Sequence, residues 1–408
     1  MRFLFVHQNG PGQYLHVVRH LARDPSHELV FITEANDRII PGVRHITYRL
    51  GRKHRADLHP HLRELELATH RAEKVAGLAR TLRGLGFRPD IIVGHHGWGE
   101  MLHLADLWPD VPMLGYFEFY YHTRGFDVNF DPEFPMAVDF EPGVRAMNAI
   151  NHAALALGQH GQTPTQFQRS AYPDWARRQI TLLPEGVDLD ICRPNPALRK
   201  LPLVIDGMTI LPSDRLITYV ARNLEPYRGY HVMMRALPRL LSARADVKVV
   251  MLGGGDVSYG ARRAGESWRD HFLRRMRGKY DESRVRLPGQ CPYDTHLALL
   301  QRSDVHVYLT YPFVASWSLR EALACGCAVV GADVEPVREF IADDRTGVLT
   351  PALDPAALAE NILSLLEDAP RAARLRRTAR RYAERHLDAA RHVDQFTDLV
   401  TKLTSASL

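Results

Sequence analysis

The sequence predicts an α/β protein with two doubly wound, Rossmann-like parallel-sheet domains that face a cleft, followed by C-terminal helices. Its 408 residues exceed what one hydrophobic core usually supports. Short apolar segments alternate with longer amphipathic ones, which is typical of parallel sheets covered by helices on both faces. The alternation pauses once, over residues 184–212, where repeated prolines predict a linker.

Each half of the chain carries its own series of strands and helices. In the first half we predict strands at residues 2–6, 28–33, 90–93, 111–114, 154–157 and 180–183, and helices at 13–22 and 62–85. In the second half we predict strands at 216–220, 248–252, 285–287, 305–309 and 328–331, and helices at 229–243, 293–301, 318–325 and beyond 370. The predicted domains are therefore 1–200 and 201–385, with a C-terminal helix in 386–408 that crosses back to the first domain.

Composition narrows the class of protein. The chain is 45% hydrophobic and 24% charged, as soluble globular proteins are. It has no window of about 18 apolar residues that would predict a membrane-spanning helix. The net charge of +5 suits an anionic ligand or membrane surface, but no stripe of basic and aromatic residues predicts nucleic-acid binding.

The four cysteines are Cys192, Cys291, Cys325 and Cys327. They form no pair of pairs typical of a metal site, and Cys325 and Cys327 are too close for an ordinary disulfide. Buried thiols in a reducing compartment are the simpler interpretation, and we therefore expect the protein in the cytoplasm.

Two strand ends in the second half carry groups suited to phosphate. Arg222 and Arg228 lie on a proline-containing loop, where guanidinium groups could bind a diphosphate or simply be solvated. Ser318 and Leu319 open a helix, and a helix N-terminus also suits phosphate. Glu321, expected in the first turn, could accept two sugar hydroxyls; alternatively, Ser318 and Glu321 form a capping box.

The first half offers candidates at three further strand ends. Gly12 allows close backbone approach or a plain turn. His95, Trp98 and Glu100 lie on a glycine-rich loop typical of a sugar-binding corner. His95 and His96 should point to opposite sides, so they should not share a metal. We expect His95 in the cleft, with a packed core histidine as the alternative. Glu118, in the aromatic segment 116–121, and the long loop 127–135 predict contacts with an acceptor.

Taken together, these residues resemble the donor site of family 4 (group 1) glycosyltransferases, which have the GT-B fold. The matching segments, in chain order, are Pro184-Glu185-Gly186-Val187-Asp188, Ala221-Arg222, Tyr227-Arg228-Gly229, Leu287-Pro288-Gly289 and Glu321-Ala322-Leu323-Ala324-Cys325-Gly326. Their order and spacing agree over residues 180–365. The first half is similar to a subgroup with a Gly-Trp-Gly-Glu loop and an aromatic segment.

The resemblance implies a retaining, metal-independent transferase that uses a nucleotide-diphosphate sugar, with UDP- and GDP-sugars the expected donors. Its site residues would be His95, Arg222 and Arg228 for catalysis; Gly12, Arg222, Arg228, Pro292, Tyr293, Ser318, Leu319 and Glu321 for the donor; and Trp98, Glu100, Glu118 and Phe313 on the sugar or acceptor side. The diphosphate would meet the arginines and the helix start, the ribose Glu321, and the base Pro292 and Tyr293. Phe313 departs from the family, which has a glutamate there that contacts the transferred sugar.

The identity of the hydroxyl acceptor is open. If it is a lipid, the basic segment 371–385 could meet the inner face of the membrane, although a solvated helix face is the favoured interpretation. Three other functions remain: a metal-dependent transferase using Asp188 and Asp190, a sugar-nucleotide epimerase, and a non-catalytic nucleotide-sugar binding protein, which Phe313 favours.

Overall fold

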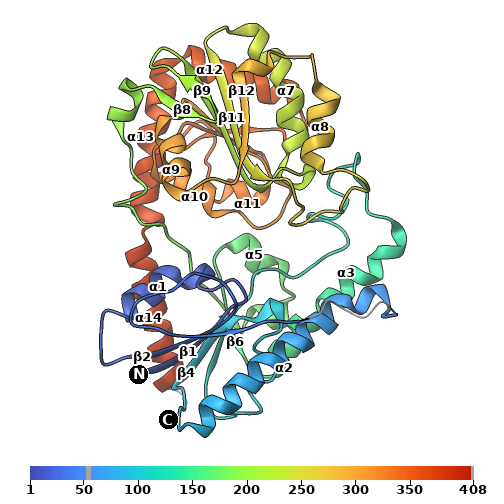
Figure 1. The fold of residues 1–408 in the computed structure, drawn as a ribbon, viewed down its shortest axis with the longest axis vertical. Helices are drawn as coiled ribbons and strands as arrows, with labels where there is room; N and C mark the ends of the chain where they lie inside the picture. The colour runs from blue at the N-terminus through green and yellow to red at the C-terminus, as the bar shows by residue number, and fades with distance from the viewer. Residues whose placement is uncertain (52–56, 406–408) are drawn as a thin grey trace. The chain divides into compact units, whose positions relative to one another are not determined.

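The computed structural model describes residues 1–51 and 57–405, which form two compact units (Figure 1). Unit 1 contains Met1–Gly125, Met136–Glu185 and Ala389–Leu408, and unit 2 contains Phe126–Pro135 and Gly186–Asp388. The division after Glu185 precedes the expected boundary at residue 200. A short segment from the first half of the chain also belongs to unit 2, because its side chains bond there, as described below.

The sheet of unit 1 is entirely parallel, with seven strands among the described residues. Their order is β3-β2-β1-β4-β5-β6-β7. The strands are β1 (Arg2–Val6), β2 (Glu28–Glu34), β3 (Arg44–Tyr48), β4 (Ile91–His95), β5 (Met113–Tyr116), β6 (His160–Thr163) and β7 (Ile180–Leu182). Alternate residues of β1 point to opposite faces, so Phe3 and Phe5 join one core cluster and Leu4 and Val6 the other.

Helices cover both faces of this sheet. They are α1 (Leu15–Leu21), α2 (Arg63–Gly84), α3 (Glu141–Met147), α4 (Ala149–Ala156), α5 (Gln166–Ala171), α6 (Asp174–Arg177) and α14 (Ala389–Ser405). One face packs against α1 and α14, and the other against α2 (Figure 1). In α14, Val393, Phe396 and Val400 recur at helical spacing and are buried in the same cluster as Phe5. The last helix of the chain is thus part of the core of unit 1.

The strand expected at residues 154–157 is wrong, since those residues end α4 and the turn after it. Its buried residues, Ile150, Asn151, Ala154 and Leu155, recur with the period of a helix, which the short run of alanine and leucine concealed. The strand that takes this place in the sheet is β6, whose sequence His-Gly-Gln-Thr carries no apolar signal. Its interior position in the sheet decides its conformation, and its own β-propensity does not.

The sheet of unit 2 is also parallel, with six strands in the described part of the chain in the order β12-β11-β10-β13-β14-β15. They are β10 (Arg215–Asn223), β11 (Val247–Gly254), β12 (Val285–Gly289), β13 (Val305–Tyr308), β14 (Val329–Ala332) and β15 (Val348–Thr350). The expected linker contains a 3₁₀ turn, η5 (Pro196–Lys200), and an antiparallel hairpin of β8 (Leu203–Ile205) and β9 (Met208–Ile210).

The helices of unit 2 are α7 (Tyr230–Ala243), α8 (Trp268–Met276), α9 (Tyr293–Arg302), α10 (Trp317–Ala324), α11 (Glu335–Arg338), α12 (Pro355–Glu367) and α13 (Ala369–His386). On one face of β10, Ile217 and Tyr219 join the large cluster that includes α7 and α12. On the other face, Leu216 packs with Leu299 of α9 and with the hairpin. The predicted fold class, two parallel-sheet α/β domains with C-terminal helices, is confirmed.

Both strand orders reverse direction once, between β1 and β4 in unit 1 and between β10 and β13 in unit 2. Open parallel sheets bind ligands at the carboxyl ends of the strands beside such a reversal, because the connecting loops there run to opposite faces and leave a crevice. The residues that follow these four strands are therefore the first place to look for a site.

Gly229, in the loop after β10, is packed closely against Leu309. Its φ is +72°, and a Cβ there would lie 2.3 Å from Cβ of Leu309. Gly278 has a similar φ of +70° but nothing within 4 Å. We expect Gly278→Ala to lower the free energy of unfolding of unit 2 by about 1 kcal/mol, from backbone strain alone. Gly229→Ala should cost about 3 kcal/mol, because the clash adds to that strain.

Urea unfolding of the two variants and the wild type measures both changes. Equal losses would show that the contact between Gly229 and Leu309 does not constrain the loop.

Candidate functional site

The two arginines after β10 have different environments. Arg222 is exposed at the end of the strand, and within residues 1–51 and 57–405 its guanidinium has no hydrogen-bond or ion-pair partner. Arg228 ends the 3₁₀ turn η6 (Pro226–Arg228) and is 5% exposed. Its Nη1 donates to Thr310 Oγ1 at 2.8 Å and to the Val314 carbonyl at 3.0 Å. Arg228 therefore joins the loop after β10 to the loop after β13, while Arg222 remains available to an anion.

Phe313 lies in an aromatic cluster around Arg228. Its ring centroid is 5.4 Å from that of Tyr227 and 5.0 Å from that of Tyr259, and the guanidinium of Arg228 lies 4.8 Å from the Tyr259 centroid. Phe313 is 2% exposed. The side chain that replaces the family's glutamate is thus packed into the wall of the site, where it stabilises the loop by burial.

The start of α10 provides backbone donors at the end of β13. Ser316 is the N-cap, and its backbone N–H donates to Tyr308 Oη at 2.7 Å. Ser318 occupies the second helical position, and its hydroxyl bonds the hydroxyl of Ser316 at 2.6 Å. The side chain of Leu319 is fully buried, which anchors this first turn against the core. N–H groups in the first turn of a helix lack helical carbonyl partners, so they suit a phosphate.

Glu321 lies in the second turn of α10, so its expected place in the first turn is wrong. The capping-box alternative is wrong as well, because the N-cap is Ser316 and its side chain makes no capping hydrogen bond to the helix backbone. The carboxylate instead accepts a hydrogen bond from Tyr293 Oη at 2.9 Å and contacts His296 Nε2 at 2.9 Å. Tyr293 is exposed at the start of α9, after the exposed N-cap Pro292. Glu321 thus ties α10 to α9 on the side where a nucleoside is expected.

In unit 1, the ends of β1, β4 and β5 bring two histidines, His7 and His95, close to one carboxylate, Glu118. His95 Nε2 lies 3.5 Å from Glu118 Oε2, and its ring stacks on Trp98 at 5.4 Å. The ring of His7 meets His95 edge-on at 5.5 Å. Three of the predicted residues therefore form one cluster. His7 was not predicted, although it follows β1 directly, at the strand end where such a residue should be sought.

Gly12 is required by His7. A Cβ at Gly12 would lie 2.6 Å from His7 Nε2, and its φ is +51°. The same Nε2 bonds Gln13 Oε1 at 2.7 Å. Burial, reinforced by the neighbouring His95, lowers the pKa of His7 to about 3, so its ring is neutral at physiological pH. The glycine therefore serves close packing between the first loop and this histidine.

Two other residues of the loop after β4, His96 and Glu100, bond to groups outside this cluster. His96 bonds the Tyr116 carbonyl through Nδ1 at 2.7 Å and Asn151 Oδ1 through Nε2 at 2.5 Å, which fixes it in the core. Glu100 has no exposed surface and accepts a hydrogen bond from Tyr48 at 2.7 Å. Burial raises the pKa of Glu100. The structure thus contradicts the expectation that Glu100 meets an acceptor, since the chain turns at Gly99 and directs it towards the helix α2 side.

The segment expected to contact the acceptor, residues 127–135, is bonded to unit 2. Asp131 accepts hydrogen bonds from Tyr311 at 2.7 Å and contacts His231 Nε2 at 3.0 Å. Tyr227 donates to Asp127 at 2.6 Å. Two of these partners, Tyr227 and Tyr311, belong to the loops that Arg228 joins. The segment therefore stabilises the loops after β10 and β13 through these bonds.

Two family models match the chain on either side of the linker. The one described as "Glycosyl transferase family 4 group" matches residues 25–192, and "Glycosyl transferases group 1" matches residues 208–382. The chain belongs to the family 4, group 1 glycosyltransferases. The second match contains every residue expected at the donor site except Gly12, and the first contains the cluster of His95, Trp98 and Glu118.

Curated relatives in this glycosyltransferase family match part of the chain. A phosphatidyl-myo-inositol mannosyltransferase of Mycolicibacterium smegmatis is 29% identical over 212 residues, 49% of this chain and 48% of the relative. A D-inositol 3-phosphate glycosyltransferase of Streptomyces avermitilis is 29% identical over 249 residues, 60% of this chain and 52% of the relative. The chain spans about half the length of the curated relatives that it matches.

Solved structures share the fold over the whole chain. Sucrose-phosphate synthase from Thermosynechococcus elongatus superposes with a TM-score of 0.74 at 17% identity and covers 100% of both chains. The Anabaena protein HepE in complex with UDP and glucose gives a TM-score of 0.70 at 16% identity, covering 98% of this chain and 99% of that one. These similarities confirm the GT-B type of fold.

Two features of the described residues bear on other functions. No helix in residues 1–51 and 57–405 is both long and apolar enough to cross a membrane. No three His, Cys, Asp or Glu side chains of that part of the chain are grouped as metal ligands would be. The carboxylate of Asp188 accepts bonds from the backbone N–H groups of Asp190 and Ile191 at 3.0 and 3.1 Å, so it caps its own turn.

The bonds to Asp131 predict a pH-dependent stability. Burial opposes its charge, but hydrogen bonds from His231 and Tyr311 leave its pKa below the ordinary value of 3.8. A lowered pKa stabilises the fold above the unfolded-state pKa and loses that contribution as the pH falls through the folded-state pKa. Asp131→Asn should therefore lower the free energy of unfolding of unit 2 by about 2 kcal/mol at neutral pH, and by less below about pH 4.

Urea unfolding at neutral and acidic pH measures this difference, with Asp190→Asn, an exposed carboxylate of the same unit, as the control. A loss that does not depend on pH would contradict the assigned charge on Asp131.

Proposed function

We propose that this protein transfers a sugar from a nucleotide-diphosphate sugar to a hydroxyl acceptor, retaining the anomeric configuration and requiring no metal. One observation supports the proposal above all. Arg222 is exposed and has no partner among the described residues, and it follows the strand at which the strand order of unit 2 reverses. The loop that contains the buried Arg228 and the start of α10 lie at the same reversal. Guanidinium and helix-start N–H groups are the donors that bind a diphosphate and stabilise the charge that grows on it as it leaves.

Glu321 is the group that we assign to the ribose. A carboxylate has about four lone-pair sites, and Tyr293 and His296 use two of them. The remaining sites can accept the two adjacent ribose hydroxyls. The exposed ring of Tyr293, with Pro292 beside it, offers a surface for the base. These features support a nucleoside site but do not select a base, and we propose UDP- or GDP-sugars as the donors.

On the side of unit 1, we propose that His95, Glu118 and Trp98 contact the transferred sugar or the acceptor. Glu118 Oε2 lies 3.5 Å from His95 Nε2, and Trp98 stacks on the imidazole ring, so the ring is positioned before a hydroxyl binds. Charge on the leaving diphosphate would be met by the arginines, so the acceptor could attack the same face of the sugar that the diphosphate leaves. We place this reaction in the cytoplasm.

A non-catalytic nucleotide-sugar binding protein is the second candidate, and Phe313 favours it. The buried ring cannot make the contact to the sugar that the family's glutamate makes. Binding of a donor without any turnover would distinguish this function, whereas turnover in the absence of an acceptor would indicate an epimerase.

Arg222→Ala is the most informative variant for the donor site. Because Arg222 is exposed and unpartnered, its loss should leave the melting temperature of the free protein unchanged. It should weaken binding of the preferred donor about 10- to 100-fold, the loss expected for one or two charge-assisted hydrogen bonds. A panel of UDP-, GDP-, ADP- and dTDP-sugars, scored by the ligand-induced rise in melting temperature, measures this effect.

Arg277→Ala removes an exposed arginine elsewhere in unit 2 and serves as the matched control. Equal donor affinity in both variants would remove Arg222 from the donor site.

Metal independence can be tested with the same donors. We expect EDTA to leave the rate of slow donor hydrolysis unchanged, and also the rate of transfer once an acceptor is found. The reason is that the arginines and the start of α10 supply the positive charge at the diphosphate. Nucleotide release and the configuration of the product are the two measurements. Loss of activity on chelation, restored by a divalent cation, would overturn this part of the proposal.

A further inference from the structure

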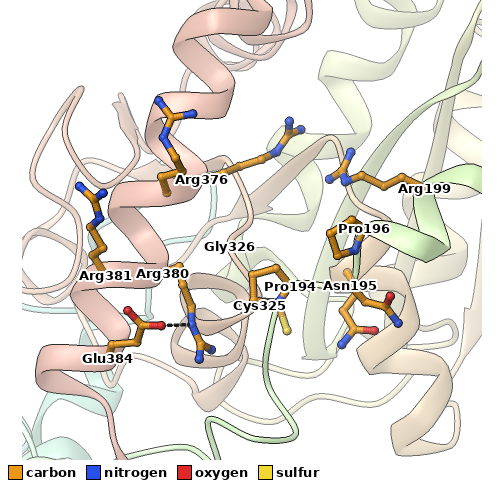
Figure 2. Close-up of a pocket in the computed structure, with 12 residues that line it drawn as sticks. Pro194, Asn195, Pro196, Arg199, Cys325, Gly326, Arg376, Arg380, Arg381 and Glu384 are labelled. Atoms are coloured by element: carbon orange, nitrogen blue, oxygen red, sulfur yellow. Dashed lines mark hydrogen bonds and ion pairs between the residues drawn. The ribbon is translucent and has the colours of Figure 1, made fainter.

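A pocket of about 390 Å³ lies in unit 2 on the side of α13 and the start of η5. Figure 2 shows Arg376 and Arg380 on α13 beside Cys325, Gly326 and Pro194, with Asn195, Pro196 and Arg199 beyond them, whereas the side chain of Arg381 lies on the other side of the helix in this view. Cys325 and Gly326 follow the last turn of α10, whereas the donor site is at its first turn. Because α10 has eight residues, its two ends are about 12 Å apart. The pocket is therefore distinct from the donor site.

The lining of this pocket is strongly basic. Its charged side chains are Arg199, Arg376, Arg377, Arg380, Arg381 and Glu384, five guanidinium groups and one carboxylate. The one carboxylate is engaged by Arg380, whose Nε lies 2.8 Å from Glu384 Oε1. The whole chain has a net charge of only +5. Positive charge is thus concentrated here well beyond the average of the protein surface.

Three of the arginines are held by groups of the protein. Arg380 donates to the carbonyls of Cys192 and Ala324 at 2.7 and 3.0 Å, which neutralises the carboxyl end of α10. Arg199 pairs with Asp304 at 2.9 Å, and Arg376 donates to the Asp304 carbonyl at 2.6 Å. Burial, reinforced by the charge of Arg199, lowers the pKa of Arg376 to about 10. The protein therefore supplies too little negative charge for its own buried arginines.

Arg377 and Arg381 are the two that remain. They lie one turn apart on the exposed side of α13, and neither has a hydrogen-bond or ion-pair partner among the described residues. Like charges at this spacing repel each other on a helix. In addition, the Nε of Arg376 is buried without an acceptor. The pocket lining thus contains two guanidinium groups without partners and one buried N–H without an acceptor. The oxygen atoms of an oxyanion can accept hydrogen bonds from all of these donors.

We propose that this pocket binds a phosphate-bearing anion at a second site, separate from the sugar donor. Guanidinium groups match the paired oxygens of phosphate, and the volume admits a diphosphate or a small phosphate ester. The phosphate could come from a soluble metabolite or from the headgroup of an anionic lipid, since either presents the same oxygens to Arg377 and Arg381.

The test uses the full-length protein and the double variant Arg377→Ala/Arg381→Ala. Both side chains are exposed and unpartnered, so folding should be preserved. The double variant Arg277→Ala/Lys279→Ala removes two exposed positive charges elsewhere in unit 2 and is the matched control for charge. The first measurement is isothermal titration with pyrophosphate while a saturating concentration of the nucleotide-sugar donor occupies the proposed donor site of each variant. The second is co-sedimentation with phosphatidylglycerol or phosphatidylcholine vesicles.

We expect the pocket variant to lose affinity for pyrophosphate by about tenfold or more relative to the charge control, while its affinity for the nucleotide-sugar donor stays unchanged. Arg222→Ala should show the opposite pattern, which separates a failure of this proposal from a failure of the donor-site assignment. If only phosphatidylglycerol vesicles show the pocket-dependent binding, the phosphate belongs to a lipid. If the pocket variant and the charge control bind both probes equally, the proposal is wrong.

Discussion

The hydrogen bonds of Arg228 hold together the loops at which we propose that the sugar donor binds. The guanidinium joins the loop after β10 to the loop after β13, at the one place where the strand order of unit 2 reverses. Its own carbonyl accepts a hydrogen bond from Tyr219 Oη at 2.6 Å, which fixes the loop to the strand below. The connection to Val314 holds the segment that leads into α10 against the loop after β10.

Most of the strand positions along the chain could be predicted because each buried strand of a parallel sheet is a short apolar run between amphipathic helices. Prediction from apolar runs failed where a buried segment is polar or where an apolar run is helical. β6 lies inside the sheet with a polar sequence, so its neighbours impose its conformation, and α4 is a helix whose alanines imitate a strand. Residues 127–135 were assigned to the wrong unit, because nothing local in them encodes bonds to Tyr227, His231 and Tyr311.

The candidate-site residues that follow directly after strands could be predicted from the sequence. His95, Trp98 and Glu118 come together because β4 and β5 are neighbours in register, and their carboxyl ends share one edge. Glu100 was misplaced because a left-handed glycine, Gly99 with a φ of +92°, reverses the chain just before it. Partners that are distant in sequence were also missed: His296 pairs with Glu321 only because α9 packs beside α10.

Phe313 changes the electrostatics of the donor site as well as its shape. A glutamate at this position would lie beside Arg228 and could neutralise it. With phenylalanine there, the guanidinium contacts a hydroxyl, a carbonyl and the face of Tyr259, and it forms no ion pair with a carboxylate of the described residues. Burial opposes the charge of Arg228, but nearby tyrosines outweigh that effect and raise its pKa, and the buried carboxylate of Glu225 also interacts with it. The cation is therefore maintained by its neighbours without the family's glutamate, and we propose that it remains able to attract a diphosphate to the same loop.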